Sequence, residues 1–104
     1  MKLLMNTAIA LAFLAGTAFA GAAEGKALFA TKCQACHGPN GEGKDAIAKM
    51  LKATMSPLAS KKVQEKSDAD LKKIITAGEG KMKPVAGLTA PQVDDIVAHL
   101  RTLK

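Results

Sequence analysis

The stretch that decides the fold is Cys33-Gln34-Ala35-Cys36-His37. Two thiols three positions apart, with an imidazole directly after the second, form the C-x-x-C-H signature of covalent haem attachment. In that chemistry each thiol forms a thioether with one haem vinyl group, and the imidazole coordinates the iron. Residues three and four apart share one face of a helix, so these three side chains can hold a single planar group. The motif therefore predicts one haem c, attached through Cys33 and Cys36 and ligated by His37.

Three other interpretations of the two cysteines remain open at this point. A redox dithiol is expected beside alternating strands and helices, and the sequence contains no convincing strand. A structural zinc ion needs four ligands, but His99 is the only thiol or imidazole outside the motif, and adjacent Cys36 and His37 would have to bind one ion. A Cys33–Cys36 disulfide suits an exported protein but leaves His37 unexplained.

The first twenty residues have the pattern of a cleavable export signal peptide. Lys2 precedes a mostly apolar stretch, and Ala18-Phe19-Ala20 is a small-x-small cleavage site. Residues 1–20 are therefore predicted to be removed, leaving 21–104 as one domain, with cleavage after Ala23 as an alternative. An uncleaved membrane anchor competes with this interpretation, because the apolar stretch approaches the roughly 18 residues needed to span a bilayer. Polar Asn6 weakens that alternative, so we expect no stable membrane insertion after signal removal.

Export indicates an oxidising compartment, which we predict to be the bacterial periplasm. Two thiols delivered there need a chemical fate, and thioether bonds provide one. The predicted mature chain has about 84 residues, a size at which burial on folding is marginal. Its only aromatic residue is Phe29. A core so poor in large side chains favours a large apolar cofactor at its centre.

Helical periodicity and capping signals predict four helices. The first covers 24–36 and is ended by Gly38-Pro39, a short second one around 47–51 is ended by Ser56-Pro57, the third covers 67–78, and the last runs from Thr89 to the end of the chain. Ser67 with Asp70, and Thr89 with Gln92, are the predicted N-terminal capping pairs. Gly25 lies one turn before Phe29, where it permits a close helix approach; a frayed start to the helix is the alternative.

Met82 is the second candidate site residue. It lies in the irregular segment 79–87 between two predicted helices and is bracketed by Gly80 and Pro84. A methionine held in such a loop is a poor core residue and a good thioether ligand for iron. Met50 and Met55 are expected to pack in the core or lie at the surface instead.

Several segments together resemble the small bacterial class I c-type cytochromes, which carry one haem with histidine and methionine ligands. The resemblance covers nearly all of the predicted mature chain. It rests on the segments Gly25-Lys-Ala-Leu-Phe29, Cys33 to Gly38, Ser67 to Gly78, Gly80-Lys-Met82-Lys-Pro84 and Leu88-Thr89. It implies an all-α, small cytochrome c fold of three to five helices wrapped round one covalent haem. The first and last helices would cross at Gly25 and Phe29, and Met82 would lie opposite His37 on the iron.

Two positions depart from the family pattern. The family usually has an aromatic residue in the middle of the last helix, where this chain has His99, so His99 is predicted to pack against Phe29 and to make the crossing sensitive to pH. Many members also have a proline some dozen residues after the haem motif, whose carbonyl accepts a hydrogen bond from the iron-ligating imidazole. Lys49 stands there, so Pro57 or a carbonyl within 45–55 is expected to take that role.

The predicted function follows from two filled axial positions. With His37 and Met82 both on the iron, no coordination site is open to a substrate, so we expect a single-electron carrier between redox partners and no enzyme. The alternative is a haem-based module that binds or senses a small ligand when Met82 is displaced.

Charge indicates the partners. The chain carries a net charge of +6, or +5 once Lys2 is removed. Lys81 and Lys83 flank Met82 and are expected to dock acidic redox proteins near the haem edge. A nucleic-acid partner is not expected, because no aromatic platform is present, and we expect a monomer. The basic residues around the Met82 segment are Lys61, Lys62, Lys66, Lys72, Lys73, Lys81 and Lys83.

Overall fold

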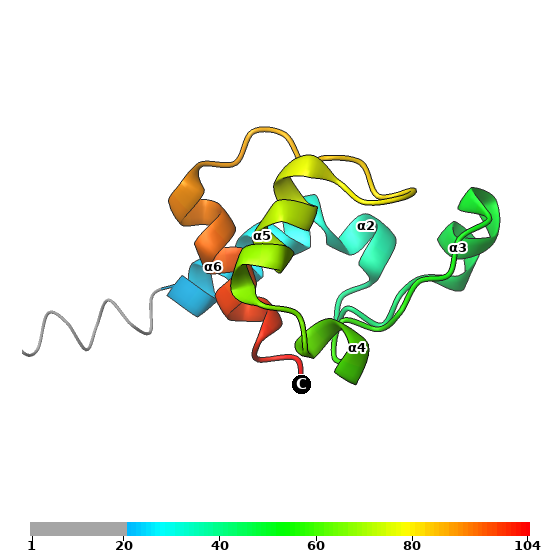
Figure 1. The fold of residues 1–104 in the computed structure, drawn as a ribbon, viewed down its shortest axis with the longest axis horizontal. Coiled ribbons are helices and arrows are strands. Elements are labelled where there is room, and N and C mark those ends of the chain that lie inside the picture. The colour runs from blue at the N-terminus through cyan, green and yellow to red at the C-terminus, as the bar shows by residue number, and fades with distance from the viewer. Residues whose placement is uncertain (1–20) are drawn as a thin grey trace, which may run out of the picture.

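The computed structural model describes residues 21–104, and in that range the fold is all-helical (Figure 1). The predicted signal peptide, residues 1–20, lies outside the described residues. The predicted fold class is confirmed, but the described residues contain more helical segments than the predicted three to five: the first helix is interrupted at Cys33, and α2 and α4 are single turns. The segments are a helix at 21–32, α2 (Gln34–His37), α3 (Asp45–Leu51), α4 (Lys61–Gln64), α5 (Asp68–Ala77) and α6 (Ala90–Leu100).

The helix at 21–32 crosses α6 at very close range. A side chain at Gly25 would collide with the backbone carbonyl of Asp95, so only glycine lets the two backbones approach this far. Phe29 is 2% exposed, and its ring packs against His99 with centroids 5.2 Å apart and planes tilted by 56°. The predicted close approach at Gly25 and the predicted packing of His99 on Phe29 are both confirmed.

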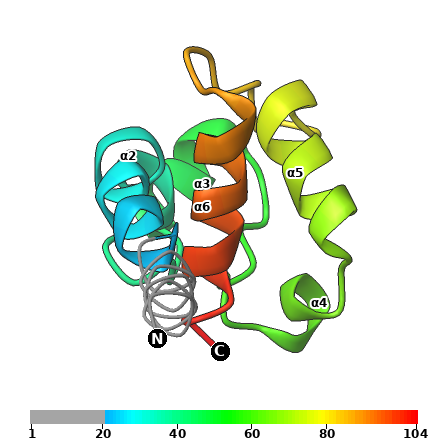
Figure 2. The same ribbon diagram turned by 90° about the vertical axis from the view of Figure 1, so that its left-hand side faces the viewer.

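Helix α6 lies between the 21–32 helix and α5 (Figure 2). Its start has the predicted capping box: Gln92 N–H donates to the Thr89 hydroxyl, and Thr89 N–H donates to the Gln92 side chain. The start of α5 uses half of such a box, since Ser67 accepts from Asp70 N–H at 3.1 Å while no reciprocal bond forms. These caps satisfy backbone donors that a helix start leaves unpaired. Both helices bury an apolar stripe, made of Leu71 and Ile75 on α5 and Val93, Ile96, Val97 and Leu100 on α6.

The remaining helices are short and weakly packed. None of α2, α3 and α4 contains a buried residue. Helix α3 ends at Lys52, which adopts a left-handed conformation (φ 53°), and not at Ser56-Pro57 as predicted. The cause is local: Lys52 N–H and Ala53 N–H bond carbonyls of the last turn, which ends the helix before the proline is reached.

Candidate functional site

The C-x-x-C-H motif occupies the point where the first helix is interrupted. Cys33 N–H donates to the Phe29 carbonyl at 2.9 Å, and His37 N–H donates to the Cys33 carbonyl at 3.1 Å, so α2 continues the chain after one irregular residue. Both thiols are free; Cys33 is half-buried and Cys36 is exposed. Cys33, Cys36 and His37 all line the same cavity. The fold therefore brings the three predicted attachment residues to one site.

That cavity has a volume of about 610 Å³ and an apolar floor. The floor comes from the well-packed helices and includes Phe29, Leu71, Ile75, Ile96 and Leu100. A cavity of several hundred cubic ångströms whose lining is mainly apolar is typical of sites that enclose a cofactor. The residues present therefore fit a large, planar, mostly apolar group gripped at α2.

Burial sets the protonation of the two half-buried members of the motif. It lowers the pKa of His37, so the imidazole is neutral near pH 7 and has a lone pair available to a metal. It raises the pKa of the Cys33 thiol, which favours the protonated form.

His37 also has an unsatisfied ring nitrogen. Its Nδ1 atom is buried and has no hydrogen-bond partner among the described residues. The hydrogen bond expected from His37 to the carbonyl of Pro57 or to a carbonyl within 45–55 is therefore not made. A buried polar atom without a partner costs about 1–3 kcal/mol. The ring therefore fits a site that is completed by a bound group.

Met82 lies in a loop that the backbone fixes firmly. Glu79 and Met82 exchange two backbone hydrogen bonds, of 3.0 and 2.9 Å, around Gly80, whose φ is 56°. A side chain at Gly78 would lie 2.6 Å from the Met82 carbonyl, so that glycine allows the loop to fold back on the end of α5. Val85 N–H then donates to the Ile75 carbonyl at 2.9 Å. The loop thus holds Met82 at the cavity, which it lines.

The three methionines of the described residues have different surroundings. Met50 is 70% exposed and does not line the cavity. Met55 does line it, but it packs against Gly43, whose N–H bonds the His37 carbonyl at 2.7 Å, so Met55 belongs to the wall beside His37. Met82 alone among these three reaches the cavity from a segment that is not bonded to the His37 region. Met82 therefore reaches the cavity independently of the segment that carries His37.

His99 is not part of this site. It is buried against Phe29, and within residues 21–104 no group of three or more histidine, cysteine or acidic side chains could hold a metal ion. The four ligands required by the zinc alternative are therefore not assembled.

Some of the lysines around Met82 form ion pairs with acidic residues, and others line the cavity. Lys61 pairs with Glu65 at 3.6 Å, and Lys72 pairs with Asp94 at 2.7 Å. Glu79 is the one acidic residue in the cavity wall. The wall contains the basic residues Lys32, Lys62, Lys66, Lys81 and Lys83.

Sequence reasoning missed the role of α4 in this wall. Lys62 and Lys66 appear in the sequence as members of a general basic cluster. The segment that carries them, α4 and the turn after it, is held in place by Gln64 and Arg101, which are 37 positions apart and carry no shared sequence signal.

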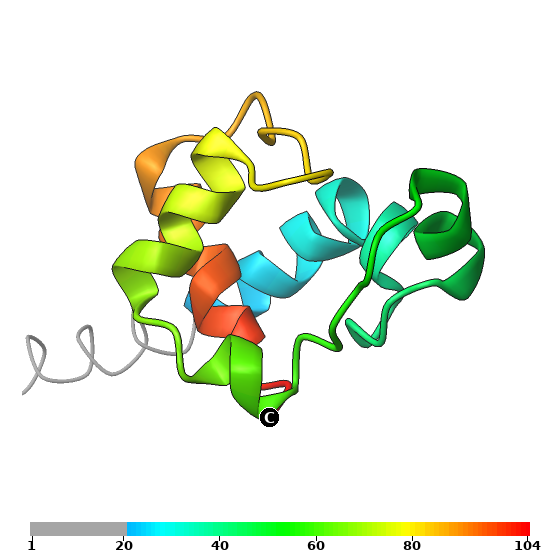
Figure 3. The same cartoon turned by 45° about the vertical axis from the view of Figure 1, so that its right-hand side comes forward.

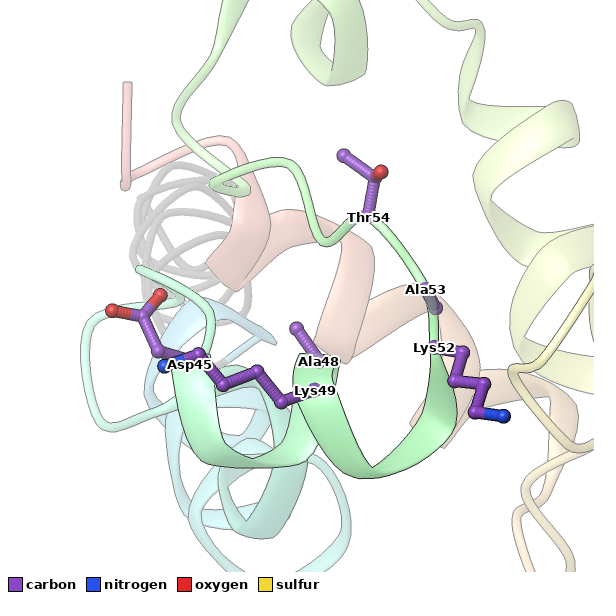
Figure 4. A pocket seen from close by; sticks show the side chains of 6 residues that line it. All are labelled: Asp45, Ala48, Lys49, Lys52, Ala53 and Thr54. Carbon is purple, nitrogen blue, oxygen red and sulfur yellow. The ribbon is translucent and has the colours of Figure 1, made fainter.

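A second hollow lies on the outer side of α3 (Figure 4). Its residues all come from 45–54, and none of them is buried. It is a surface depression of one short segment and supports no functional assignment.

Comparisons with known proteins agree with this geometry. The sequence model of the cytochrome c family matches residues 22–104. A solved structure described as "KustC0563 c-type cytochrome" is similar with a TM-score of 0.63 and 28% sequence identity, covering 77% of this chain and 96% of that chain. A search of curated proteins gave no match. In the part of the chain that the structure describes, no helix has the length and apolar character needed to cross a membrane.

Proposed function

Because the chain belongs to the cytochrome c family, we propose that it is a periplasmic single-electron carrier with His37 and Met82 as axial ligands of one haem c. Proteins of this family bind covalent haem c and are electron carriers, not enzymes. Cys33 and Cys36 fit the attachment site of that haem. When bound, the haem supplies the one-electron couple of its iron.

The observation that carries the proposal is that His37 and Met82 line one cavity from two separate segments. A neutral imidazole and a thioether can then occupy both axial positions, which leaves no coordination site for a substrate. The thioether favours ferrous iron and raises the reduction potential relative to a second imidazole. The apolar floor of the cavity limits the access of water to the site.

Export is supported by the sequence before the domain. The cleavage pattern at Ala18-Phe19-Ala20 falls directly before the family match, which begins at residue 22. We therefore assign residues 1–20 to a cleavable signal peptide and residues 21–104 to the mature domain.

Docking is assigned to the exposed lysines at the mouth of the cavity. Lys81 and Lys83 are both exposed and both contribute to the cavity wall, next to Met82. Positive charge at this edge would steer acidic redox proteins toward the haem, mainly by raising the rate of encounter.

The first experiment tests Met82 as a ligand. Met82→Leu should abolish the weak red charge-transfer band of ferric thioether coordination, and Met82→His should lower the reduction potential, because imidazole favours ferric iron. Optical redox titration of the holoprotein measures both. Met55→Leu is the matched control, since Met55 lines the same cavity, and it should keep the band.

Two results would contradict this assignment. Loss of the band in Met55→Leu with retention in Met82→Leu would exchange the two methionines. Rapid binding of carbon monoxide by the reduced wild-type protein would favour the ligand-binding alternative, because a six-coordinate carrier reacts poorly.

The second experiment tests the docking edge. Exposed charges are screened over about 8 Å at physiological ionic strength, so electron transfer to an acidic partner should slow as salt rises. Lys81→Glu with Lys83→Glu should lower the second-order rate about tenfold at low salt and flatten its salt dependence. Stopped-flow kinetics measures the rate. The control, Lys26→Glu on the first helix, should change it little; equal sensitivity to Lys26 would reduce the edge to an ordinary solubilising surface.

A further inference from the structure

Helix α4 and the turn after it present two lysines to the cavity, and no carboxylate of the described chain forms an ion pair with either of them. Lys62 and Lys66 both contribute to the cavity wall, and neither forms an ion pair within residues 21–104. The nearby acids are already engaged: Glu65 pairs with Lys61, which is 89% exposed, and Asp68 pairs with Arg101 at 2.8 Å. Positive charge therefore accumulates on the cavity side of α4.

This helix is rigidly attached even though it is one turn long and buries no residue. The Gln64 side chain donates to the Leu58 carbonyl at 2.8 Å and to the Leu100 carbonyl at 3.0 Å. Arg101 donates to the Gln64 carbonyl at 3.0 Å and to the Lys66 carbonyl at 2.7 Å. We call these contacts the Gln64–Arg101 clamp. The clamp fastens the backbone between the two lysines to the end of α6.

The position of α4 relative to the attachment motif indicates which part of a bound haem would lie near these two lysines. A haem has its two vinyl groups on one edge and its two propionate carboxylates on the opposite edge. Thioether bonds at Cys33 and Cys36 would hold the vinyl edge at the start of α2. Helix α4 lies at the lower edge of the ribbon, apart from α2, whereas the loop after α5 reaches back toward α2 in the upper part (Figures 1 and 3). With the vinyl edge held at α2, the carboxylate edge would face away from the attachment motif, on the side of the cavity where α4 lies.

We propose that Lys62 and Lys66 bind the two propionates of haem c and that the Gln64–Arg101 clamp positions them. This assignment rests on the proposed function, since it requires a haem anchored at α2. A carboxylate that enters a partly buried cavity loses hydration, and an ammonium group beside it offsets that cost. The same positive charge stabilises the ionised propionate and the ferrous iron.

The test measures the propionates themselves in the holoprotein. Their pKa values come from the pH dependence of the haem NMR signals and of the reduction potential. Lys62→Met and Lys66→Met should each raise a propionate pKa by about half a unit to one unit. The effect is modest because solvent screens charges at a partly exposed site. Gln64→Leu should raise the propionate pKa less, through misplacement of the lysines. Lys61→Met, the matched control on the same helix, should leave it unchanged.

The outcomes separate this assignment from the proposed function. A covalent haem whose propionate pKa values change in Lys81→Met or Lys83→Met, and not in Lys62→Met and Lys66→Met, would overturn the assignment alone. Equal responses to Lys61→Met and Lys62→Met would overturn it as well, because the effect would then be the general charge of the helix. Failure of the wild-type chain to carry a covalent haem would overturn the proposed function and this assignment together.

Discussion

The two halves of the described chain differ in how many apolar residues they bury. In the crossing half, the 21–32 helix, α5 and α6 supply every buried apolar residue of the described chain. In the cavity half, α2, α3 and α4 bury none. Hydrophobic burial at about 25 cal/mol per Å² stabilises the first half by its own contacts. In the second half the core is met only by partly buried residues such as Cys33 and Val63, so we expect its order to depend more strongly on a group bound in the cavity.

The largest expected effect comes from removing the anchors of that group. Cys33→Ser combined with Cys36→Ser should abolish covalent haem, because no thiol remains to form a thioether. Acid-acetone extraction measures the attachment. Amide hydrogen exchange should show faster exchange in α2, α3 and α4 than in α6. Equal loss of protection in both halves would show that the crossing half is not independent of the cofactor.

A change in the crossing half should act on stability and leave attachment intact. Gly25→Ala places a methyl group against the Asp95 carbonyl, so α6 must move, at a cost of about 3 kcal/mol of unfolding free energy. Denaturant titration of the holoprotein measures it. Gly21→Ala on the same helix is the control, because its added atom meets only the Asp95 side chain at 3.4 Å. Comparable losses in the two variants would mean that helix propensity, and not the close approach, sets the cost.

The smallest expected effect is a pH dependence of the same crossing. Burial, and then the charge of Lys26, lower the pKa of His99, which is 7% exposed. Folding thus favours the neutral ring: stability is fully present above the unfolded value of about 6.5 and is lost as pH falls through the lower folded pKa. Thermal unfolding of the holoprotein between pH 7 and pH 4 measures this. His99→Phe keeps an aromatic ring on Phe29 and should remove part of the loss; an unchanged profile would assign the loss to other groups.

Much of the crossing half could be predicted because its signals are local. Thr89 with Gln92 defines the start of α6 through bonds between residues three apart, and the apolar stripe on α6 follows from helical periodicity. Gly25 was ambiguous, since a glycine near a helix start fits both a close crossing and a frayed end. The contact with Asp95, seventy positions away, resolves it.

The cavity half was predicted less completely. The sequence predicts that α3 ends at Ser56-Pro57, but Lys52 adopts a left-handed conformation that its residue type does not predict. The expected hydrogen-bond acceptor for His37 is missing from the described residues. Both features depend on backbone geometry in segments with little packing, where sequence preferences are weak.

The sequence by itself determined the chemistry, because attachment needs only Cys33, Cys36 and His37 at fixed local spacing. The tertiary structure alone decided which distant groups share the cavity. It brings Met82 into the wall and places Met55 beside His37. It also brings Lys62 of α4 and Lys66, two residues beyond the end of α4, into the same wall on a segment that is hydrogen-bonded to the end of α6. The physical reason is that a motif specifies contacts within a helical turn, whereas contacts between remote segments arise only when burial and backbone hydrogen bonds fold the chain.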